Sequence, residues 1–167
     1  MMSREWAQVP EKYLPILNEY TSERPVRVGA LAKALGLEVK SATLKSGISG
    51  EIRPSESADA GFKVRVNRHE VKTRQRFTIA HEIAHFLLHQ KHIGSGISDT
   101  VLYRSSLSSR IEAEANRLAA DIVMPAKLLR EDMRDLDLSS DEVSAETLAE
   151  IYEVSKQAMK VRVGLGR

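Results

Sequence analysis

The chain has 167 residues, 42% of them hydrophobic, and a formal net charge of +2 at pH 7. This length suits one domain that buries its own core. The chain has no cysteine, which excludes disulfides, iron–sulfur clusters and thiolate zinc, so a metal site would need His, Asp or Glu. No apolar run is long enough to span a membrane, and the N-terminus is too charged for a signal peptide, so we expect a cytoplasmic protein.

The first part of the chain predicts helices followed by a small sheet. Residues 5–20 indicate a helix that Pro10 and Pro15 bend or interrupt. A short helix over Val28–Leu35 should follow, and Gly36 is well placed to end it. Short, partly alternating runs rich in β-branched residues then predict a small, antiparallel sheet over residues 37–44, 49–53 and 61–67.

The remainder is expected to be mostly helical, which makes the fold class α+β. Arg74 to Gln90 predicts a long helix with apolar residues on nearly all faces, so this helix should be central and buried. The Gly/Ser-rich stretch 93–108 has the length of loops that often act as lids or binding loops. Further helices are predicted over residues 110–123, 126–134, 144–152 and 155–163.

The long helix carries the sequence His81-Glu82-Ile83-Ala84-His85, an H-E-x-x-H motif. Residues four apart lie on one helical face, so both imidazoles can reach one Zn²⁺ at about 2.0–2.1 Å. Glu82 lies next to that face, where its carboxylate can take a proton from a water that the zinc activates. The alternative is a core helix whose two histidines are satisfied by neighbours. We favour the metal, because unpaired imidazoles in an apolar helix are costly.

His89 and His92 follow the motif but are not expected to be ligands. His89 is two helical turns, about 12 Å, beyond His81, and three ligands of one zinc cannot be strung along a straight helix. Families that use a third histidine break the helix with Gly, as H-E-x-x-H-x-x-G-x-x-H, and this chain has Leu88 and Lys91 at those positions. Both histidines are interpreted as helix-end residues, where a cationic ring suits the dipole.

The third ligand should come from the helix over 110–123, which offers two acids. Glu112 falls on the inward stripe of small and apolar residues, whereas Glu114 lies on a mostly polar flank. Asn116, one turn after Glu112, could orient a ligating histidine through its free ring nitrogen. The alternative is that Glu112 is a first-turn acid that favours the helix dipole, with Ser109 as its capping-box partner.

These two helices resemble the ImmA/IrrE zinc metallopeptidases of bacteria and their mobile elements. The stretches "RFTIAHEIAHFLLH" and "IEAEANRLAADIVMP" are similar to that family's F-T-x-A-H-E-x-x-H and E-x-x-A-N-x-F-A-A-x-x-L-M-P. Glu112 and Asn116 fall on the Glu and Asn of the second pattern, which favours Glu112 as the ligand. Leu118 and Val123 are mild departures. Weaker similarity on both sides extends the match over most of the chain.

The resemblance implies a compact α+β, zincin-like domain over residues 1–167 with a buried H-E-x-x-H helix. We expect a helical segment over 1–24, a catalytic core over 25–134 and C-terminal packing helices over 135–167. The implied site is of the gluzincin type and the implied reaction is peptide-bond hydrolysis. Better-known members of the family relieve repression by cleaving a helix-turn-helix repressor that is often encoded next door.

The predicted function is therefore a zinc-dependent endopeptidase that cleaves such a repressor, or an antitoxin-like partner, at specific bonds. Zn²⁺ would be held by His81, His85 and Glu112, and Glu82 would be the general base. The residue that stabilises the oxyanion is open: Tyr103 is a candidate neutral donor, with Tyr152 or a histidine as alternatives.

Two other function classes compete with this prediction. The first is a metal-bound regulator or sensor without hydrolytic activity. The second is a DNA-binding transcriptional regulator, since Ala149 and Val154-Ser155 in "TLAEIYEVSKQAM" are spaced as in a helix-turn-helix, although Glu153 stands where Gly is expected. Its recognition helix would be Lys156–Val163, with only three cations. Ala and Leu at such spacings are more often ordinary helix packing, so direct DNA binding is not favoured.

Overall fold

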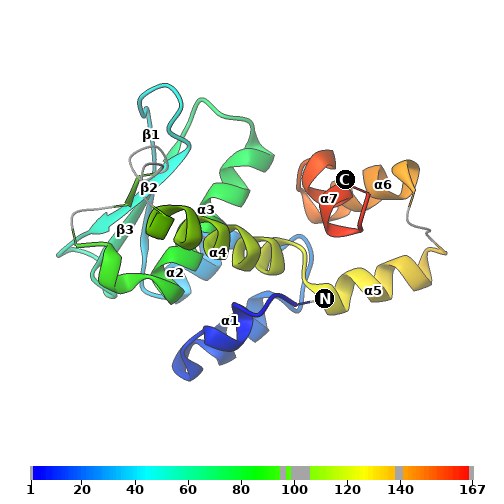
Figure 1. Ribbon diagram of the computed structural model, residues 1–167, viewed down its shortest axis with the longest axis horizontal. Helices are drawn as coiled ribbons and strands as arrows, with labels where there is room; N and C mark the ends of the chain where they lie inside the picture. The colour runs from blue at the N-terminus through cyan, green and yellow to red at the C-terminus, as the bar shows by residue number, and fades with distance from the viewer. Residues whose placement is uncertain (1, 95–96, 99–105, 138–140, 166–167) are drawn as a thin grey trace.

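The computed structural model describes residues 2–94, 97–98, 106–137 and 141–165 (Figure 1). Within these residues the fold is α+β, as expected, with seven α-helices and a small four-stranded sheet. The sheet and helix α3 (Lys72–Leu88) lie on one side of the molecule, and the last three helices lie on the other (Figure 1). None of the described helices is long and apolar enough to cross a membrane.

The N-terminal segment is less continuous than the single helix expected over residues 5–20. It forms two 3-10 turns, η1 (Trp6–Gln8) and η2 (Glu11–Tyr13), and then α1 (Leu14–Tyr20). Pro15 lies in the first turn of α1, where its missing N–H breaks no helical hydrogen bond. The prolines thus divide the segment, as their effect on a helix predicts.

Helix α2 (Val28–Ala34) ends close to the predicted position. Gly36 follows it with a φ of +85°, which is the left-handed conformation that glycine adopts at helix ends. A Cβ at this position would also lie 3.0 Å from the backbone nitrogen of Ala60, so the glycine is required by space as well as by conformation.

The sheet has the strand order β1-β3-β2-β4 and is mixed. β3 (Phe62–Asn67) pairs antiparallel with β2 (Gly50–Pro54), which pairs antiparallel with the short β4 (Ile97–Ser98). β1 (Glu38–Ala42) pairs parallel with β3, so the expectation of an antiparallel sheet is wrong for this strand. The physical reason is that side-chain alternation identifies a strand but not the direction of its neighbour, and β2 intervenes between β1 and β3 in the chain.

Helix α3 packs on the sheet and is the centre of the core, as the sequence predicts. Ile52 of β2 and Val64 of β3 are fully buried in the same apolar cluster as Ile83 and Ala84 of the helix. The helix approaches β2 closely at Gly50, where a Cβ would lie only 2.4 Å from Thr78 Cγ2. Glycine at this position therefore allows the helix that carries the H-E-x-x-H motif to rest directly on the strand.

Helix α4 (Ser106–Val123) packs along α3 and runs antiparallel to it. The direction follows from two contacts, because residue 81 of α3 meets residue 116 of α4 and residue 85 meets residue 112. Pro125 then precedes α5 (Ala126–Asp135), as expected for a residue that cannot continue the first helix. The apolar face of α4 lies in the core through Ala115, Leu118, Ala119 and Ile122.

The last two helices form a hairpin that folds back onto the rest of the molecule. α6 (Glu142–Tyr152) and α7 (Lys156–Arg162) are joined by a turn in which Glu153 has a φ of 51°. Arg162 Nη2 donates a hydrogen bond of 2.9 Å to the carbonyl oxygen of Met124 at the end of α4. This contact fixes α7 beside the two helices that carry the candidate site.

Candidate metal centre

Four buried polar residues from α3 and α4 lie at the centre of the helix pair. His81 is 6% exposed and Glu112 is 7% exposed, while Glu82 and His85 are fully buried. The two histidines are one turn apart on the face of α3 that meets α4, and Glu112 extends from the inward stripe of α4. Charged and polar groups are rarely buried to this degree without partners, so their mutual geometry decides what the cluster can do.

Three side chains of this cluster converge on one point. His81 Nε2 lies 3.1 Å from His85 Nε2 and 3.1 Å from Glu112 Oε2, and His85 Nε2 lies 2.8 Å from Glu112 Oε1. Ligand atoms at about 2.0–2.1 Å from a tetrahedral zinc are about 3.3 Å apart. The three side chains therefore have nearly the spacing of one face of a metal tetrahedron. Among the residues that the structure describes, this is the group of His, Asp and Glu side chains that could hold a metal ion.

Asn116 orients the ring of His81. Its side-chain oxygen lies 2.9 Å from His81 Nδ1, one helical turn from Glu112. An amide oxygen can only accept a hydrogen bond, so His81 Nδ1 carries the proton and its Nε2 presents a lone pair to the cluster. This is the contact that the sequence predicts for Asn116.

His89 orients the ring of His85 through a second, independent chain of contacts. His89 Nε2 lies 2.9 Å from Glu114 Oε2, and His89 Nδ1 lies 3.0 Å from His85 Nδ1. The carboxylate only accepts, so His89 donates from Nε2 and accepts at Nδ1 from the Nδ1–H of His85. His85 Nε2 then presents a lone pair to the same point as His81 Nε2. Two lone pairs and a carboxylate that meet within about 3 Å repel one another unless a cation lies between them.

His89 ends helix α3, as expected, but it is not the cationic ring that the sequence suggested. The residue is 4% exposed, and burial lowers its pKa below the ordinary histidine value, which favours the neutral ring. The sequence did contain a signal for this contact. His89 lies four residues after His85, and this spacing places His81, His85 and His89 on one helical face. His92 is exposed, which fits its interpretation as a residue at the end of the helix.

Glu114 is more than a member of a polar flank. Its side chain is 17% exposed and accepts the hydrogen bond from His89, with Arg110 Nε 3.7 Å away. Sequence reasoning missed this role, because it asked only whether Glu114 or Glu112 lies on the inward stripe. Both acids act towards α3, but they contact different histidines.

The protonation states of the cluster suit a metal ligand set. Burial lowers the pKa of His85 to about 4, so its ring is neutral at pH 7. Metal ligation requires a neutral imidazole, and this form of His85 is already present before a metal binds.

Glu82 is fully buried beside the cluster but is not one of the three converging groups. Its Oε1 lies 3.6 Å from the point where a Gly50 Cβ would be, so the carboxylate is on the side of α3 that rests on strand β2. It therefore occupies the place next to the ligand face that the H-E-x-x-H spacing predicts for it.

The family model described as IrrE N-terminal-like domain, Peptidase_M78, matches residues 33–163. The chain belongs to this family. The matched region begins in α2 and ends after α7, so it includes the sheet, all three converging side chains and the C-terminal hairpin. The resemblance inferred from the sequence is thus confirmed, and membership supports a metallopeptidase-type function. No curated protein matches the chain.

A cavity of about 840 Å³ adjoins the cluster of this family member. His81, Glu112 and Asn116 form part of its wall, together with residues of α7 such as Val161. The two ligand-type side chains can therefore be reached from outside through a space large enough for several amino-acid residues.

The candidates for an oxyanion donor have different outcomes. Tyr103 lies outside the described residues. Tyr152 is fully buried and its hydroxyl donates a hydrogen bond of 2.7 Å to Asp132 Oδ2, and burial raises its pKa further. Because Asp132 lies on α5 and Tyr152 does not line the cavity, Tyr152 is not a donor for the metal centre.

Proposed function

We propose that the protein is a zinc-dependent endopeptidase. The observation that carries this proposal is the convergence of His81 Nε2, His85 Nε2 and one Glu112 carboxylate within 2.8–3.1 Å of one another. The separate orientation of each histidine supports a metal, because outer partners of this kind fix the tautomers of metal-binding histidines. Membership in a peptidase family supports the reaction class.

In this proposal each residue of the motif has a separate role. His81, His85 and Glu112 hold the zinc ion. When bound, zinc supplies a Lewis acid and lowers the pKa of water at the site towards neutrality. A carboxylate oxygen of Glu82 takes the proton from the water that attacks the peptide carbonyl carbon, and it can then pass this proton to the departing amine.

We also propose that the whole chain works as one catalytic domain, with residues 25–134 as its core. Two contacts of the N-terminal segment support this, since the backbone nitrogen of Ser3 donates to Asp121 Oδ2 over 2.8 Å and Arg117 Nη2 pairs with the buried Glu5 over 2.7 Å. Both contacts hold the segment on α4, the helix that carries Glu112.

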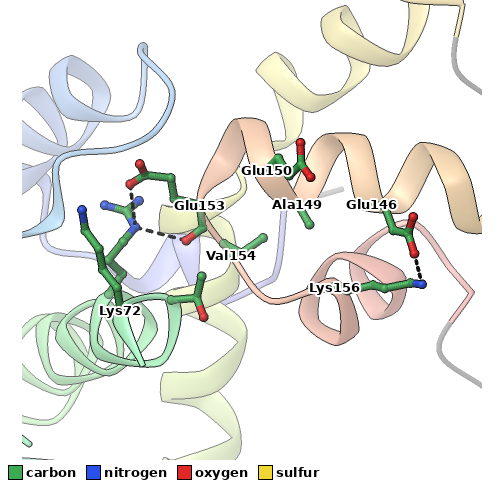
Figure 2. A pocket seen from close by; sticks show the side chains of 9 residues that line it. Lys72, Glu146, Ala149, Glu150, Glu153, Val154 and Lys156 are labelled. Carbon is green, nitrogen blue, oxygen red and sulfur yellow. Dashed lines mark hydrogen bonds and ion pairs between the residues drawn. The ribbon is translucent and has the colours of Figure 1, made fainter. Parts of the chain in front are cut away.

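The DNA-binding alternative is less well supported by the C-terminal hairpin. Glu153 does adopt the left-handed conformation expected at a helix-turn-helix turn. However, Lys156 and Lys160 each pair with a glutamate of α6, as Figure 2 shows for Lys156, and Arg162 Nη2 lies 3.0 Å from Asp121 Oδ1. These pairs leave the proposed recognition helix a weaker positive surface than its sequence suggests.

We propose that the substrate is a protein partner in the cytoplasm: a helix-turn-helix repressor or antitoxin-like protein from an adjacent gene. The support for this partner is analogy with the family resemblance. A small enzyme whose selectivity comes from docking to its partner should ignore unrelated polypeptides.

The test is to incubate the zinc-loaded protein with casein, a generic peptide library and the repressor encoded by the neighbouring gene. We expect cleavage of the repressor at one or a few bonds and no digestion of casein. Rapid, sequence-tolerant digestion of casein would instead identify a general degradative peptidase. A repressor that binds but stays intact would favour the non-hydrolytic regulator.

His89 and Glu114 should act as a positioning pair for His85. Replacing His89 with leucine should lower zinc affinity about 10–100-fold, the usual loss when an outer partner of a metal ligand is removed. His89→Gln should recover part of the loss, because its amide can still donate to Glu114 or accept from His85. Competition with a fluorescent zinc chelator measures the affinities.

The matched control is His92→Leu, which removes an exposed imidazole from the same end of α3. It should leave zinc affinity unchanged. If His92→Leu weakens zinc binding as much as His89→Leu, the effect is a general one of the helix end and His89 does not position His85.

A further inference from the structure

The cavity beside the metal centre is elongated along helices α3 and α4. On α3 it is lined from His81 back to Thr73, and along α4 it is lined from Glu112 to Met124, the residue that follows this helix. Because the two helices are antiparallel, both series run the same way, from the converging side chains towards the C-terminal hairpin. His85 does not line the cavity, so the metal centre lies at one end of it.

We call this cavity beside the metal centre the trough, and its length can be compared with that of an extended peptide. Arg74 and His81 are seven positions apart on α3, which is about 10 Å at 1.5 Å per residue, and Glu112 and Met124, the residue after α4, are twelve positions apart, about 18 Å. An extended chain advances about 3.3–3.6 Å per residue. The trough therefore has room for roughly three to five residues of an extended polypeptide beyond the metal centre.

The wall of the trough is mostly apolar. Helix α7 and the turn before it, α3 with the residue before it, α4 and the loop before β2 all contribute to this wall. Two of these side chains are unusually open to solvent for their type, since Val71 is 71% exposed and Val161 is 59% exposed. The apolar lining residues are Val71, Phe77, Ala120, Met124, Val154, Ala158 and Val161.

The charges along the trough disfavour basic ligand side chains. Apart from the ligand-type Glu112, the charged lining residues in the part of the chain that the structure describes are Arg74 and Arg117. Their side chains are 62% and 42% exposed. Arg74 pairs with Glu70 and Arg117 pairs with Glu5, and neither glutamate lines the trough. A lysine or arginine of a substrate would therefore find no carboxylate in the described lining apart from the ligand-type Glu112, so basic side chains should be disfavoured.

We propose that this trough binds the substrate segment on one side of the scissile bond and selects an apolar side chain next to that bond over a basic one. This inference rests on the proposed endopeptidase function and adds a preference in the bound sequence. Helix α7 is then a wall of the substrate site, with Ala158 and Val161 facing the bound segment.

A neighbouring cavity, of about 510 Å³, does not have these properties. It lies on the other side of Val154, and the residues that Figure 2 labels around it are mainly charged. Its charges are also satisfied within the protein, because Arg76 binds Glu153 and Lys156 binds Glu146. None of the three converging side chains lines it. The trough beside the metal centre is therefore the better candidate for the scissile segment.

The experiment uses three succinyl hydroxamates that share one backbone and differ in one side chain: hydrogen, isobutyl or 4-aminobutyl. The hydroxamate group binds zinc, so the side chain is presented to the adjoining trough. Calorimetry with the zinc-loaded protein should show at least about tenfold tighter binding for isobutyl than for hydrogen, because burial of a leucine-like group is worth this much or more. The 4-aminobutyl compound should bind no tighter than hydrogen.

Glutamate substitutions in α7 test whether the trough causes this preference. Ala158→Glu and the more exposed Val161→Glu should each reduce the isobutyl advantage and strengthen binding of the 4-aminobutyl compound, with zinc content unchanged. The control is Val143→Glu, which adds the same charge at an exposed valine of α6, 72% exposed and outside the trough. Its affinities should follow the wild type.

Equal binding of the isobutyl and hydrogen compounds to the wild type would overturn the inference. So would an isobutyl advantage that persists in both α7 variants. The outcome is separable from the proposed function. A preference for the isobutyl hydroxamate in a protein that hydrolyses no peptide bond supports the trough and contradicts the endopeptidase function. Hydrolysis without this preference supports the endopeptidase function and contradicts the trough.

Discussion

Replacing Glu82 with glutamine should remove nearly all hydrolysis while zinc stays bound. The substitution keeps the shape of a side chain that is fully buried between α3 and β2, but it removes the carboxylate that can take a proton. A positioned general base contributes about 10²–10⁴-fold, so kcat/KM for the cleaved partner should fall by that factor. Elemental analysis of the same sample should give the zinc content of the wild type.

Glu51→Gln is a suitable control for this experiment. Glu51 is also buried, at 4% exposure, but its carboxylate pairs with Arg53 and Arg65 on the sheet and lies outside the converging group. Loss of this buried carboxylate should leave kcat/KM close to that of the wild type. A Glu82→Gln variant that cleaves the partner normally would show that the mechanism is wrong, even in a protein that holds zinc.

The same experiment separates the endopeptidase from the non-hydrolytic regulator. A sensor needs the three side chains that hold the metal, but it has no use for a base beside them. If partner cleavage is never observed and Glu82→Gln leaves partner binding and regulation intact, the sensor becomes the better account.

The helices could be predicted from the sequence because their signals are local. The predicted range 126–134 compares with Ala126–Asp135 in the structure, since Pro125 sets its start whatever the tertiary contacts. The predicted range 74–90 compares with Lys72–Leu88 in the structure, and its signal is also local, because apolar residues cover that stretch on nearly every face. Antiparallel packing of α3 and α4 then brings together residues that lie on their inward stripes.

The parts that sequence reasoning missed depend on neighbours far away in the chain. The parallel pairing of β1 with β3 is one example, because no local pattern states the direction of a partner strand. His89 is another, since its position after the motif suggested an exposed helix end, and only the packing of α4 buries its ring against Glu114. Tertiary burial, rather than helix position, decides whether such a ring is charged.

Glu112 should be the carboxylate ligand, and its replacement by alanine should cause the largest loss of zinc affinity of any single acid. Glu112→Ala leaves two histidines and water at the centre, so the loss should exceed the 10–100-fold that is typical when an outer partner is removed. Glu114→Ala should stay within about that outer-partner range, because its carboxylate reaches the metal centre only through His89 and His85. Competition with a chelator of known affinity measures both variants on one scale.

The two variants control for each other, since they remove the same group from positions two residues apart on one helix. Glu112→Gln adds a further check, because it keeps the volume and one oxygen but loses the negative charge. The two neutral imidazoles cannot replace this charge in balancing the metal cation. It should fall between the wild type and Glu112→Ala. Equal losses for Glu112→Ala and Glu114→Ala, or a larger loss for Glu114→Ala, would reverse the assignment and make the flank of α4, not its inward stripe, the source of the third ligand.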